Sequence, residues 1–533
     1  MVRHGLGIAI FSVLSAVSLS VIGCGGTGSG MGVLEPFPTG TSSTPTGTST
    51  PVPPTPDEPD NVAYDVVNNK DLRNPVYQYV DDSNNVYTVQ GFTVGATGMS
   101  DQQCKYRLLK YSTTDKEADP QEVTINIRNA NGGYTKGDLA NPYYITGIID
   151  SMGTVEDRTD DRLYLAVTDL GTTKAVYLMD LGARAEGWKE ARAVNVFDCG
   201  TNLKATCPLT CSFGSSSFNR EGDAINTLFY TDYSDTGTVK FIAFDEKIFN
   251  NGKPTDKLSG NVANCGNVFT DLTLNYPAVI KANEGPWVTV TCQGNSRVYF
   301  FANNDSLTDF KGDSKYPLAN VPKYVNYIQP ENAHLDLQNP YDFAWASGVA
   351  DNEGEESQYL TIASGFALDK YGKASSAYDK GALWIYKFDS TKYADSLQNL
   401  RNNDGEYTLI LDELQYPVNV TFTNPLDQSD KRYLDIAYLT TGTSTSYNVK
   451  DLRGTLSFCR YDAKSKKLVN KSDVDLLEKI ADPFGLVALP GTLAESSYPV
   501  QFLFTTHWNW NIDFTEKSHI YSYSKTINLE AGE

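Results

Sequence analysis

Alternating hydrophobic and polar positions recur in short runs along most of the chain. The runs RLYLAVTD from Arg162 and QYLTIAS from Gln358 are typical, because both combine Tyr with aliphatic residues and are bounded by polar segments. Alternation with aromatic and β-branched residues indicates half-buried β-strands, and helical spacing of apolar residues is scarce. The pattern therefore predicts an all-β fold.

A proline precedes one strand in every group of predicted strands, at a nearly constant interval. The X-Pro pairs are Asn74-Pro75, Asn141-Pro142, Cys207-Pro208, Tyr276-Pro277, Asn339-Pro340, Tyr416-Pro417 and Asp482-Pro483. Successive pairs lie 67, 66, 69, 63, 77 and 66 residues apart. Proline is tolerated as the first residue of a strand, where its missing N–H removes no ladder hydrogen bond. The pairs therefore predict repeats one to seven, each of about 68 residues.

Each proline is followed by the same order of predicted strands. A first strand and a polar loop lead to a second strand, and the third tends to end in aspartate, as at Asp180 and Asp462. A fourth strand, such as ARAVNVFD to Asp198, is fainter. Four antiparallel strands repeated seven times predict a seven-bladed β-propeller over residues 62–533. A pair of β-sandwiches is the alternative, but it does not require one recurring proline. We expect Val62–Val67 to add an outer strand that closes the ring against the last blade.

The N-terminal segment has the features of an export signal. A short basic start precedes an apolar run of 17 residues from Leu6 to Ile22, which is short for a membrane span. The run ends in Val21-Ile22-Gly23-Cys24, which resembles the lipobox of bacterial lipoproteins. The resemblance implies a signal peptide over residues 1–23, a diacylglycerol on the Cys24 thiol and acylation of the new N-terminus. Several acyl chains together anchor a protein stably in a membrane. An ordinary signal peptide followed by a chance cysteine is the alternative.

The segment after Cys24 has the composition of a tether. From Gly25 to Asp60, 27 of 36 residues are Gly, Ser, Thr or Pro. The segment therefore has too few apolar residues to form a core. We therefore predict a disordered tether over residues 24–61, spanning roughly 30 Å as a flexible coil. Because Gly25 stands where aspartate signals inner-membrane retention in lipoproteins, the resemblance implies an outer-membrane location in the cell envelope.

The charge of the chain excludes one class of partner. The sequence has 44 Lys and Arg against 65 Asp and Glu, which gives a net charge of −21. A protein this acidic repels nucleic acid and anionic lipid surfaces. Its predicted contact with a membrane is therefore through the N-terminal lipid alone.

Seven cysteines besides Cys24 are present. In an oxidising compartment such residues are disulfide candidates. Five of them lie close together in the sequence, which predicts one or two local bridges and leaves the pairing open. The candidates are Cys199, Cys207, Cys211, Cys265 and Cys292.

The predicted loops between second and third strands are long in repeats one, five, six and seven. In a propeller such loops share one face with the connections between blades, so the long loops would form a wall beside the channel mouth. Aromatic rings there are suited to binding, because they bury a large area with few rotatable bonds. The alternative is that these rings pack the loops onto the propeller. The candidate binding residues in the loops are Tyr371, Tyr378, Tyr447, Trp508, Asn509 and Trp510.

Signatures of catalysis are sparse. The histidines that follow the leader, His334, His507 and His519, show no metal-ligand spacing, and nucleophile-elbow, phosphate-loop and haem motifs are absent. We assign no catalytic residue, no metal ligand and no cofactor. Asp342, two residues after Pro340, is expected to point into the channel and is a further candidate for binding. Asp150 is a weaker candidate carboxylate.

Two acidic segments remain. They lie at residues 156–161 and 351–356, on the predicted opposite face of the ring, and they give only weak support for a calcium site. A solvated acidic surface is the simpler interpretation.

Together these features favour a lipid-anchored binding or scaffold protein of the cell envelope that engages a protein or glycan through its long-loop face. The alternative is an envelope enzyme that acts on a glycan or polysaccharide through carboxylates at the channel mouth. A structural assembly subunit is a third hypothesis, and the uneven loops argue against it.

The lipid anchor is directly testable. We expect Cys24→Ser to move the protein from the membrane fraction to the soluble fraction of the cells that produce it, because serine offers no thiol for the lipid. Ser20→Ala, which leaves the lipobox residues intact, should stay with the membranes. Persistent attachment of the Cys24→Ser protein would contradict the anchor.

Overall fold

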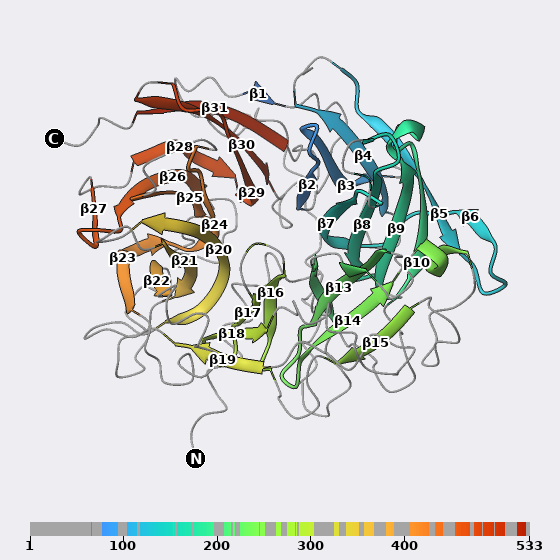
Figure 1. The fold of residues 1–533 in the computed structure, drawn as a ribbon, viewed down its shortest axis with the longest axis horizontal. Helices are drawn as coiled ribbons and strands as arrows, with labels where there is room; N and C mark the ends of the chain where they lie inside the picture. The colour runs from blue at the N-terminus through green and yellow to red at the C-terminus, as the bar shows by residue number, and fades with distance from the viewer. Residues whose placement is uncertain are drawn as a thin grey trace, which may run out of the picture.

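Figure 1 shows the protein, as a computed structural model, to be a ring of antiparallel sheets. The structure describes residues 65–66, 77–93, 104–113, 118–152, 154, 157–171, 174–196, 207–214, 217–218, 224–244, 246–250, 263–267, 274–282, 284, 287–302, 324–329, 337–350, 356–366, 380–388, 406–425, 432–440, 453–469, 474–481, 483–494, 496–506 and 520–528.

The first three repeats hold the following strands. Repeat one contains β2 (Gln78–Val80), β3 (Asn85–Thr93), β4 (Cys104–Ser112) and β5 (Gln121–Arg128), with β6 (Tyr134–Lys136) paired to β5. Repeat two contains β7 (Pro142–Asp150), β8 (Arg162–Asp169), β9 (Ala175–Ala183) and β10 (Glu190–Asn195). Repeat three contains β11 (Pro208–Phe213), β13 (Ala224–Asp232), β14 (Thr238–Phe244) and β15 (Ala263–Asn267), with β12 (Ser217–Phe218) paired to β13.

The remaining repeats follow the same order. Repeat four contains β16 (Pro277–Lys281), β17 (Trp287–Cys292), β18 (Arg297–Ala302) and β19 (Tyr324–Ile328). Repeat five contains β20 (Gln338–Ala350), β21 (Glu356–Phe366), β22 (Lys380–Phe388) and β23 (Glu406–Gln415). Repeat six contains β24 (Pro417–Phe422), β25 (Tyr433–Thr440), β26 (Arg453–Asp462) and β28 (Val474–Ala481), with β27 (Lys467–Leu468) paired to β26. Repeat seven contains β29 (Pro483–Pro490), β30 (Ser497–Thr506) and β31 (Ile520–Asn528).

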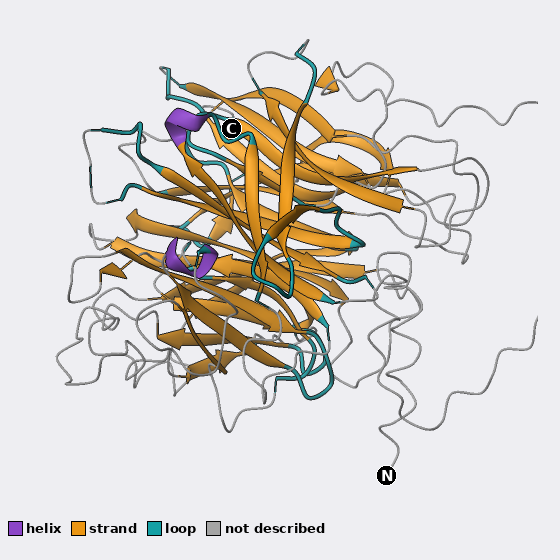
Figure 2. Cartoon of the chain, turned by 90° about the vertical axis from the view of Figure 1, so that its right-hand side faces the viewer, coloured by secondary structure: helices purple, strands orange, loops and turns teal. Residues whose placement is uncertain are grey.

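The predicted all-β propeller is confirmed by this arrangement. Strands β2, β7, β16, β24 and β29 surround the middle of the ring, and later strands of each repeat lie further out (Figure 1). Figure 2, a side view, shows the strands running through the thickness of the ring, with connections at both edges. The helices of the described residues are two 3-10 turns, η3 (Arg184–Glu186) and η4 (Glu246–Phe249). No helix in this part of the chain has the length and apolarity to span a membrane.

Five of the seven predicted strand starts are confirmed, and Pro75 lies outside the described residues. The proline of the X-Pro pair is the first residue of β7, β11, β16, β24 and β29, and Pro340 lies inside β20. The ring closes as expected, because β1 (Asp65–Val66) pairs antiparallel with β31 through Asp65 opposite Ser522 and Val66 opposite Tyr521. A strand from near the N-terminus thus completes the sheet formed by the C-terminal strands.

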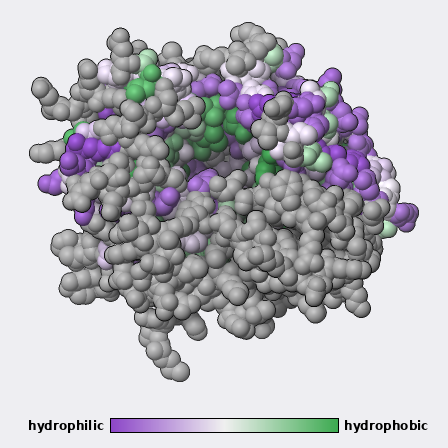
Figure 3. Space-filling view, viewed as in Figure 1, coloured by the Kyte–Doolittle hydropathy of each residue, from purple (hydrophilic) through white to green (hydrophobic). Residues whose placement is uncertain are grey.

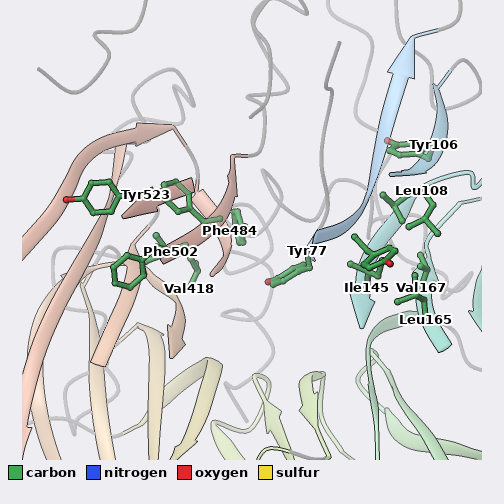
Figure 4. Packing of buried hydrophobic residues seen from close by; sticks show 14 of the residues in the cluster. Tyr77, Tyr106, Leu108, Ile145, Leu165, Val167, Val418, Phe484, Phe502 and Tyr523 are labelled. Carbon is green, nitrogen blue, oxygen red and sulfur yellow. The ribbon is translucent and has the colours of Figure 1, made fainter. Parts of the chain in front are cut away.

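The core lies between neighbouring sheets rather than inside any one of them. Buried side chains of repeat two pack against those of repeat three around Phe213 and Phe244, and those of repeat four pack against repeat five around Trp287 and Trp384. Similar clusters join the third repeat to the fourth and the fifth to the sixth. The largest cluster joins the sixth and seventh repeats to the first two, and Figure 4 shows Tyr77 between its two halves. Each sheet therefore buries both faces against its neighbours.

One strand pairing was not predicted from the sequence. The outer strands β5 and β10 pair in parallel, with Thr124 opposite Glu190 and Ile127 opposite Ala193. This pairing joins repeats one and two into one sheet of nine strands. It covers an edge that each repeat would otherwise expose.

A proline–glycine contact joins several repeats at their strand starts. A Cβ added to Gly381, in β22 of repeat five, would lie 2.2 Å from Cδ of Pro417, the first residue of repeat six's β24. A Cβ at Gly237 would lie 2.4 Å from Cδ of Pro277, and one at Gly454 would lie 2.8 Å from Cδ of Pro483. Because each proline ring lies against the glycine at the start of the preceding repeat's third strand, this position has no room for a side chain.

Gly381→Ala tests this contact. The new Cβ would also lie 2.4 Å from the Ser364 carbonyl oxygen, so the neighbouring backbone must move. We expect the free energy of unfolding to fall by about 1–3 kcal/mol, as in other overpacked sites. Gly133→Ala is the control, because its Cβ would meet nothing nearer than 3.4 Å. Equal denaturant midpoints for the two variants would contradict the proposed role of the contact.

Candidate functional site

Polar contacts join the first strands of successive repeats around the middle of the ring. The Gln78 amide donates to the Gly485 carbonyl at 2.6 Å, and the Gly485 N–H donates to Oδ1 of Asn419 at 2.9 Å. The Asn419 amide donates to Oδ2 of Asp342 at 3.0 Å, and Nζ of Lys281 lies 3.3 Å from Oδ1 of Asp342. These contacts run through repeats one, seven, six, five and four, so side chains of four repeats and the Gly485 backbone of repeat seven form one network.

Asp342 lies within this network and not at an open surface. It is 5% exposed, and besides Asn419 and Lys281 it accepts hydrogen bonds from the backbone N–H groups of Phe343 at 2.8 Å and Val420 at 3.3 Å. Both carboxylate oxygens are therefore engaged. A carboxylate held this way is suited to fixing the inner strands and poorly placed to attack a substrate.

Lys281 bridges two carboxylates. Its ammonium lies 3.3 Å from Oδ1 of Asp342 and 3.3 Å from Oε2 of Glu284, and it donates to the Phe343 carbonyl. The side chain of Lys281 is 15% exposed, whereas that of Glu284 is 43% exposed. The two carboxylates raise the pKa of Lys281 against the effect of its burial, so the ammonium stays charged.

Tyrosines gather beside this network. We define the central tyrosine cluster as Tyr77, Tyr143, Tyr144, Tyr233, Tyr276, Tyr341 and Tyr416. The Tyr77 ring lies 4.7 Å from that of Tyr144 and 6.1 Å from that of Tyr143, between ring centroids. Tyr341 lies 6.4 Å from Tyr416, and a hydrogen bond joins its side chain to Tyr143. In Figure 4 the Tyr77 ring projects from its strand toward the side of Phe484 and Val418.

Part of the cluster is open to solvent. Tyr143, Tyr144, Tyr233 and Tyr276 are half-buried, and Tyr77, Tyr341 and Tyr416 are buried. Figure 3 shows hydrophobic residues in a recess near the middle of the ring, with hydrophilic residues beside it. The half-buried rings can therefore contact a ligand while the buried rings support them.

The tyrosines are neutral under ordinary conditions. Burial raises the pKa of Tyr77, and the hydroxyls of Tyr143 and Tyr144 and the Asp342 carboxylate raise it further. Burial also raises the pKa of Tyr144 and Tyr341. Each hydroxyl therefore keeps its proton and can donate a hydrogen bond.

The chain enters several of these strands in an unfavourable conformation. Tyr276, Asn339 and Tyr416, each directly before a repeat's proline, have positive φ angles of 52°, 44° and 57°. Left-handed backbone at residues other than glycine has a cost and concentrates at functional sites. Two of these three residues, Tyr276 and Tyr416, belong to the central tyrosine cluster. The surrounding contacts must therefore keep the backbone of the cluster in this unfavourable conformation.

The bases of the predicted long loops lie beside the cluster. A Cβ added to Gly365, near the end of β21, would lie 3.3 Å from the Asn339 amide and from the Tyr416 ring. Gly381, where the chain returns from the same loop, lies against Pro417. Both described ends of the repeat-five loop therefore lie beside residues of the central tyrosine cluster or the proline next to it, and the common face of the long loops stays a prediction. The six candidate residues carried by the loops are outside the described residues and stay predictions: Tyr371, Tyr378, Tyr447, Trp508, Asn509 and Trp510.

The cysteine prediction is partly wrong. Cys211 and Cys292 are buried thiols outside any disulfide, as is Cys459. Cys211 packs in the contact between repeats two and three, whereas Cys292 packs between repeats three and four, so proximity in the sequence does not bring them together. Burial raises the pKa of both thiols. Cys207 is disulfide-bonded. The pairing of Cys199 and Cys265 lies outside the described side chains, as does Cys24.

The described residues of the first acidic segment are paired with residues outside it. Oδ2 of Asp161 lies 3.0 Å from the Arg184 guanidinium, and Asp160 accepts a hydrogen bond from the Thr154 hydroxyl at 2.7 Å. Asp161, Arg158 and Tyr79 line a cleft of about 430 Å³ between repeats one and two. The described residues contain no group of three or more His, Cys, Asp or Glu side chains that could hold a metal ion.

Asp150 is likewise paired. Its carboxylate accepts hydrogen bonds from the Asn226 amide at 2.7 Å and from the Met152 N–H at 2.9 Å. It is 6% exposed, so these contacts favour a structural role.

Comparisons with known proteins do not assign the chain to a family. No protein-family model and no curated protein matches the chain. Among solved structures, a streptogramin B lyase aligns over 86% of this chain and 94% of its own, at 10% identity and a TM-score of 0.38. A six-bladed β-propeller lectin of Aleuria aurantia aligns over 78% and 97%, at 7% identity and 0.32. A Bacillus subtilis levansucrase mutant aligns over 74% and 84%, at 12% identity and 0.29. Similarity this low gives no information about ligand or activity.

The central tyrosine cluster was not predicted, although it can be recognised in the sequence from the short distance between its tyrosines and the repeat prolines. Tyr77, Tyr143, Tyr144, Tyr341 and Tyr416 all lie within two residues of a repeat's proline. Because the prolines mark the innermost strands, tyrosines at these offsets meet in the middle of the ring. Glu284 had no such signal, since it lies in a loop after β16.

Lys281→Met tests the inner network. Removing the ammonium leaves the buried Asp342 carboxylate without its cation, and we expect the free energy of unfolding to fall by about 3 kcal/mol. Adding Asp342→Asn to Lys281→Met should recover part of the loss, measured by denaturant unfolding. Lys136→Met is the control, because that lysine is 67% exposed and lies 3.7 Å from Glu122. Equal effects of the two lysine variants would contradict the network's importance.

Proposed function

We propose that this protein is a lipid-anchored propeller of the bacterial cell envelope that binds a glycan at its central tyrosine cluster. The observation that carries the proposal is the meeting of seven tyrosines from several repeats beside an amide–carboxylate network. The lipobox and the tether support the anchored location, and the outer membrane is the membrane we propose.

The chemistry of the cluster suits a sugar. Aromatic rings stack on the C–H faces of pyranose rings, and neutral tyrosine hydroxyls donate to and accept from sugar hydroxyls. Four half-buried rings present such groups, and the buried network beneath fixes the strands that carry them. A rigid site loses little conformational entropy on binding, which favours affinity.

The long loops extend the proposed site. Trp508 and Trp510, with Asn509 between them, would add stacking surfaces at the rim, and Tyr371, Tyr378 and Tyr447 would do so on neighbouring repeats. The proximity of the described loop bases to Tyr416 supports this placement. A protein ligand on the same face is the other partner that the sequence predicts.

An envelope enzyme acting on a polysaccharide is the second candidate. Asp342 and Glu284 both lie 3.3 Å from the Lys281 ammonium, so two carboxylates are close together in the middle of the ring. Hydrolysis of a glycosidic bond needs one carboxylate free to act as nucleophile or base. The four contacts of Asp342 weigh against this role, and binding without cleavage is the function we favour.

A double variant tests glycan binding. We expect Tyr143→Ala with Tyr144→Ala to weaken binding of whichever oligosaccharide an array identifies by about tenfold or more, because two stacking surfaces are lost. Tyr407→Ala, a tyrosine 38% exposed on the outer strand β23, is the control and should bind normally. The measurement is isothermal titration calorimetry, with thermal unfolding to verify the fold. Unchanged affinity in the folded double variant would reject this site, and release of shortened sugars would favour the enzyme.

A further inference from the structure

We propose that the central tyrosine cluster selects a glycan that carries positive charge, namely an oligosaccharide of amino sugars with free amines. This inference rests on the proposed function, because the same rings would hold the ligand. It adds the charge of the ligand, which stacking alone does not determine.

The three charged groups beside the cluster, Lys281, Asp342 and Glu284, differ in their capacity to contact a ligand. The Lys281 ammonium has three N–H donors, and Asp342, Glu284 and the Phe343 carbonyl all lie within reach of them. Lys281 therefore has little to offer an anionic ligand. Asp342 is buried, with both oxygens engaged. Glu284 has the most exposed side chain of these three charged groups, at 43%. Partial burial raises the pKa of its carboxyl, and the Lys281 ammonium opposes that rise.

The field at the tyrosine rings is negative. Asp342 directly follows Tyr341 of the cluster, and its carboxylate lies 3.3 Å from the Lys281 ammonium that also contacts Glu284. Burial is the main cause of the raised pKa of Tyr77 and Tyr144, and the Asp342 carboxylate raises both pKa values further, as Glu284 does for Tyr144. Among the described charged groups of this network, one lysine and two carboxylates give a net negative charge. An amine that approaches Tyr144 would therefore lie near an accessible carboxylate.

Two further properties favour a cation. The face of an aromatic ring attracts positive charge, and a site made of neutral tyrosines next to a carboxylate strengthens that attraction. The net charge of −21 also draws cations toward the protein over longer distances, to an extent that salt reduces. An anionic sugar would meet Glu284 and the same negative field.

The test uses three β-1,4-linked tetrasaccharides of equal length, made of glucosamine, N-acetylglucosamine or glucose. We expect the glucosamine tetramer to bind the intact protein about tenfold more tightly than the two neutral ones at low ionic strength. The preference should shrink as salt is added. Calorimetric titration of each tetrasaccharide measures the preference directly.

Glu284→Gln tests whether the Glu284 carboxylate causes the preference for the glucosamine tetramer. The variant should lose most of the preference while keeping its affinity for the neutral tetramers. Glu246→Gln is a matched control, because Glu246 is also 43% exposed and is paired with a basic residue, Arg162, at the outer side of repeats two and three. The control should keep the full preference.

The outcomes separate this inference from the function on which it rests. Equal affinity for all three tetrasaccharides, or a preference that survives in Glu284→Gln, overturns the charge selectivity and leaves glycan binding in place. Failure of all three to bind, while the array identifies another oligosaccharide, also overturns the charge selectivity. Failure of the array to identify any oligosaccharide contradicts glycan binding itself, and the inference falls with it.

Discussion

The burial of each sheet face against the next sheet is the constraint on which the whole structure depends. In the described part of the chain, the apolar side chains of each repeat pack in clusters that join it to neighbouring repeats. An open row of such sheets would expose two apolar faces, so the row must close. Closure is achieved through the largest cluster, which joins the last two repeats to the first two, and through the pairing of β1 with β31.

Much of this architecture was readable from the sequence. The prolines identified the first strands because a missing N–H is harmless there, and Val62–Val67 was predicted to supply the closing strand that β1 provides. The parallel pairing of β5 with β10 was not predictable, because strand alternation does not reveal which edges meet. The contact between Gly381 and Pro417 was also missed, since a glycine's lack of space is a property of the assembled ring.

The site was harder to predict than the fold, because it depends on contacts between repeats that the sequence pattern does not reveal. Asp342 was expected in the channel from its offset after Pro340, but its neighbours decide what it does, and four contacts make it part of the scaffold. Cys211 and Cys292 appeared suited to disulfides because they are among five cysteines between residues 199 and 292, yet they pack in different contacts between sheets. The offset of a residue from its repeat's proline predicts where the residue lies along a strand. Which residues of other repeats it contacts can be seen only in the assembled ring.

The network from Gln78 to Lys281 holds the inner strands in the middle of the ring. The tyrosines near the starts of those strands are the rings that we propose to contact a ligand. A crystal structure of the protein with a bound oligosaccharide tests this claim most directly. The account predicts a sugar ring stacked on Tyr143 or Tyr144, with a substituent near Glu284. A sugar bound only at another surface, with the central tyrosine cluster unoccupied, would contradict it.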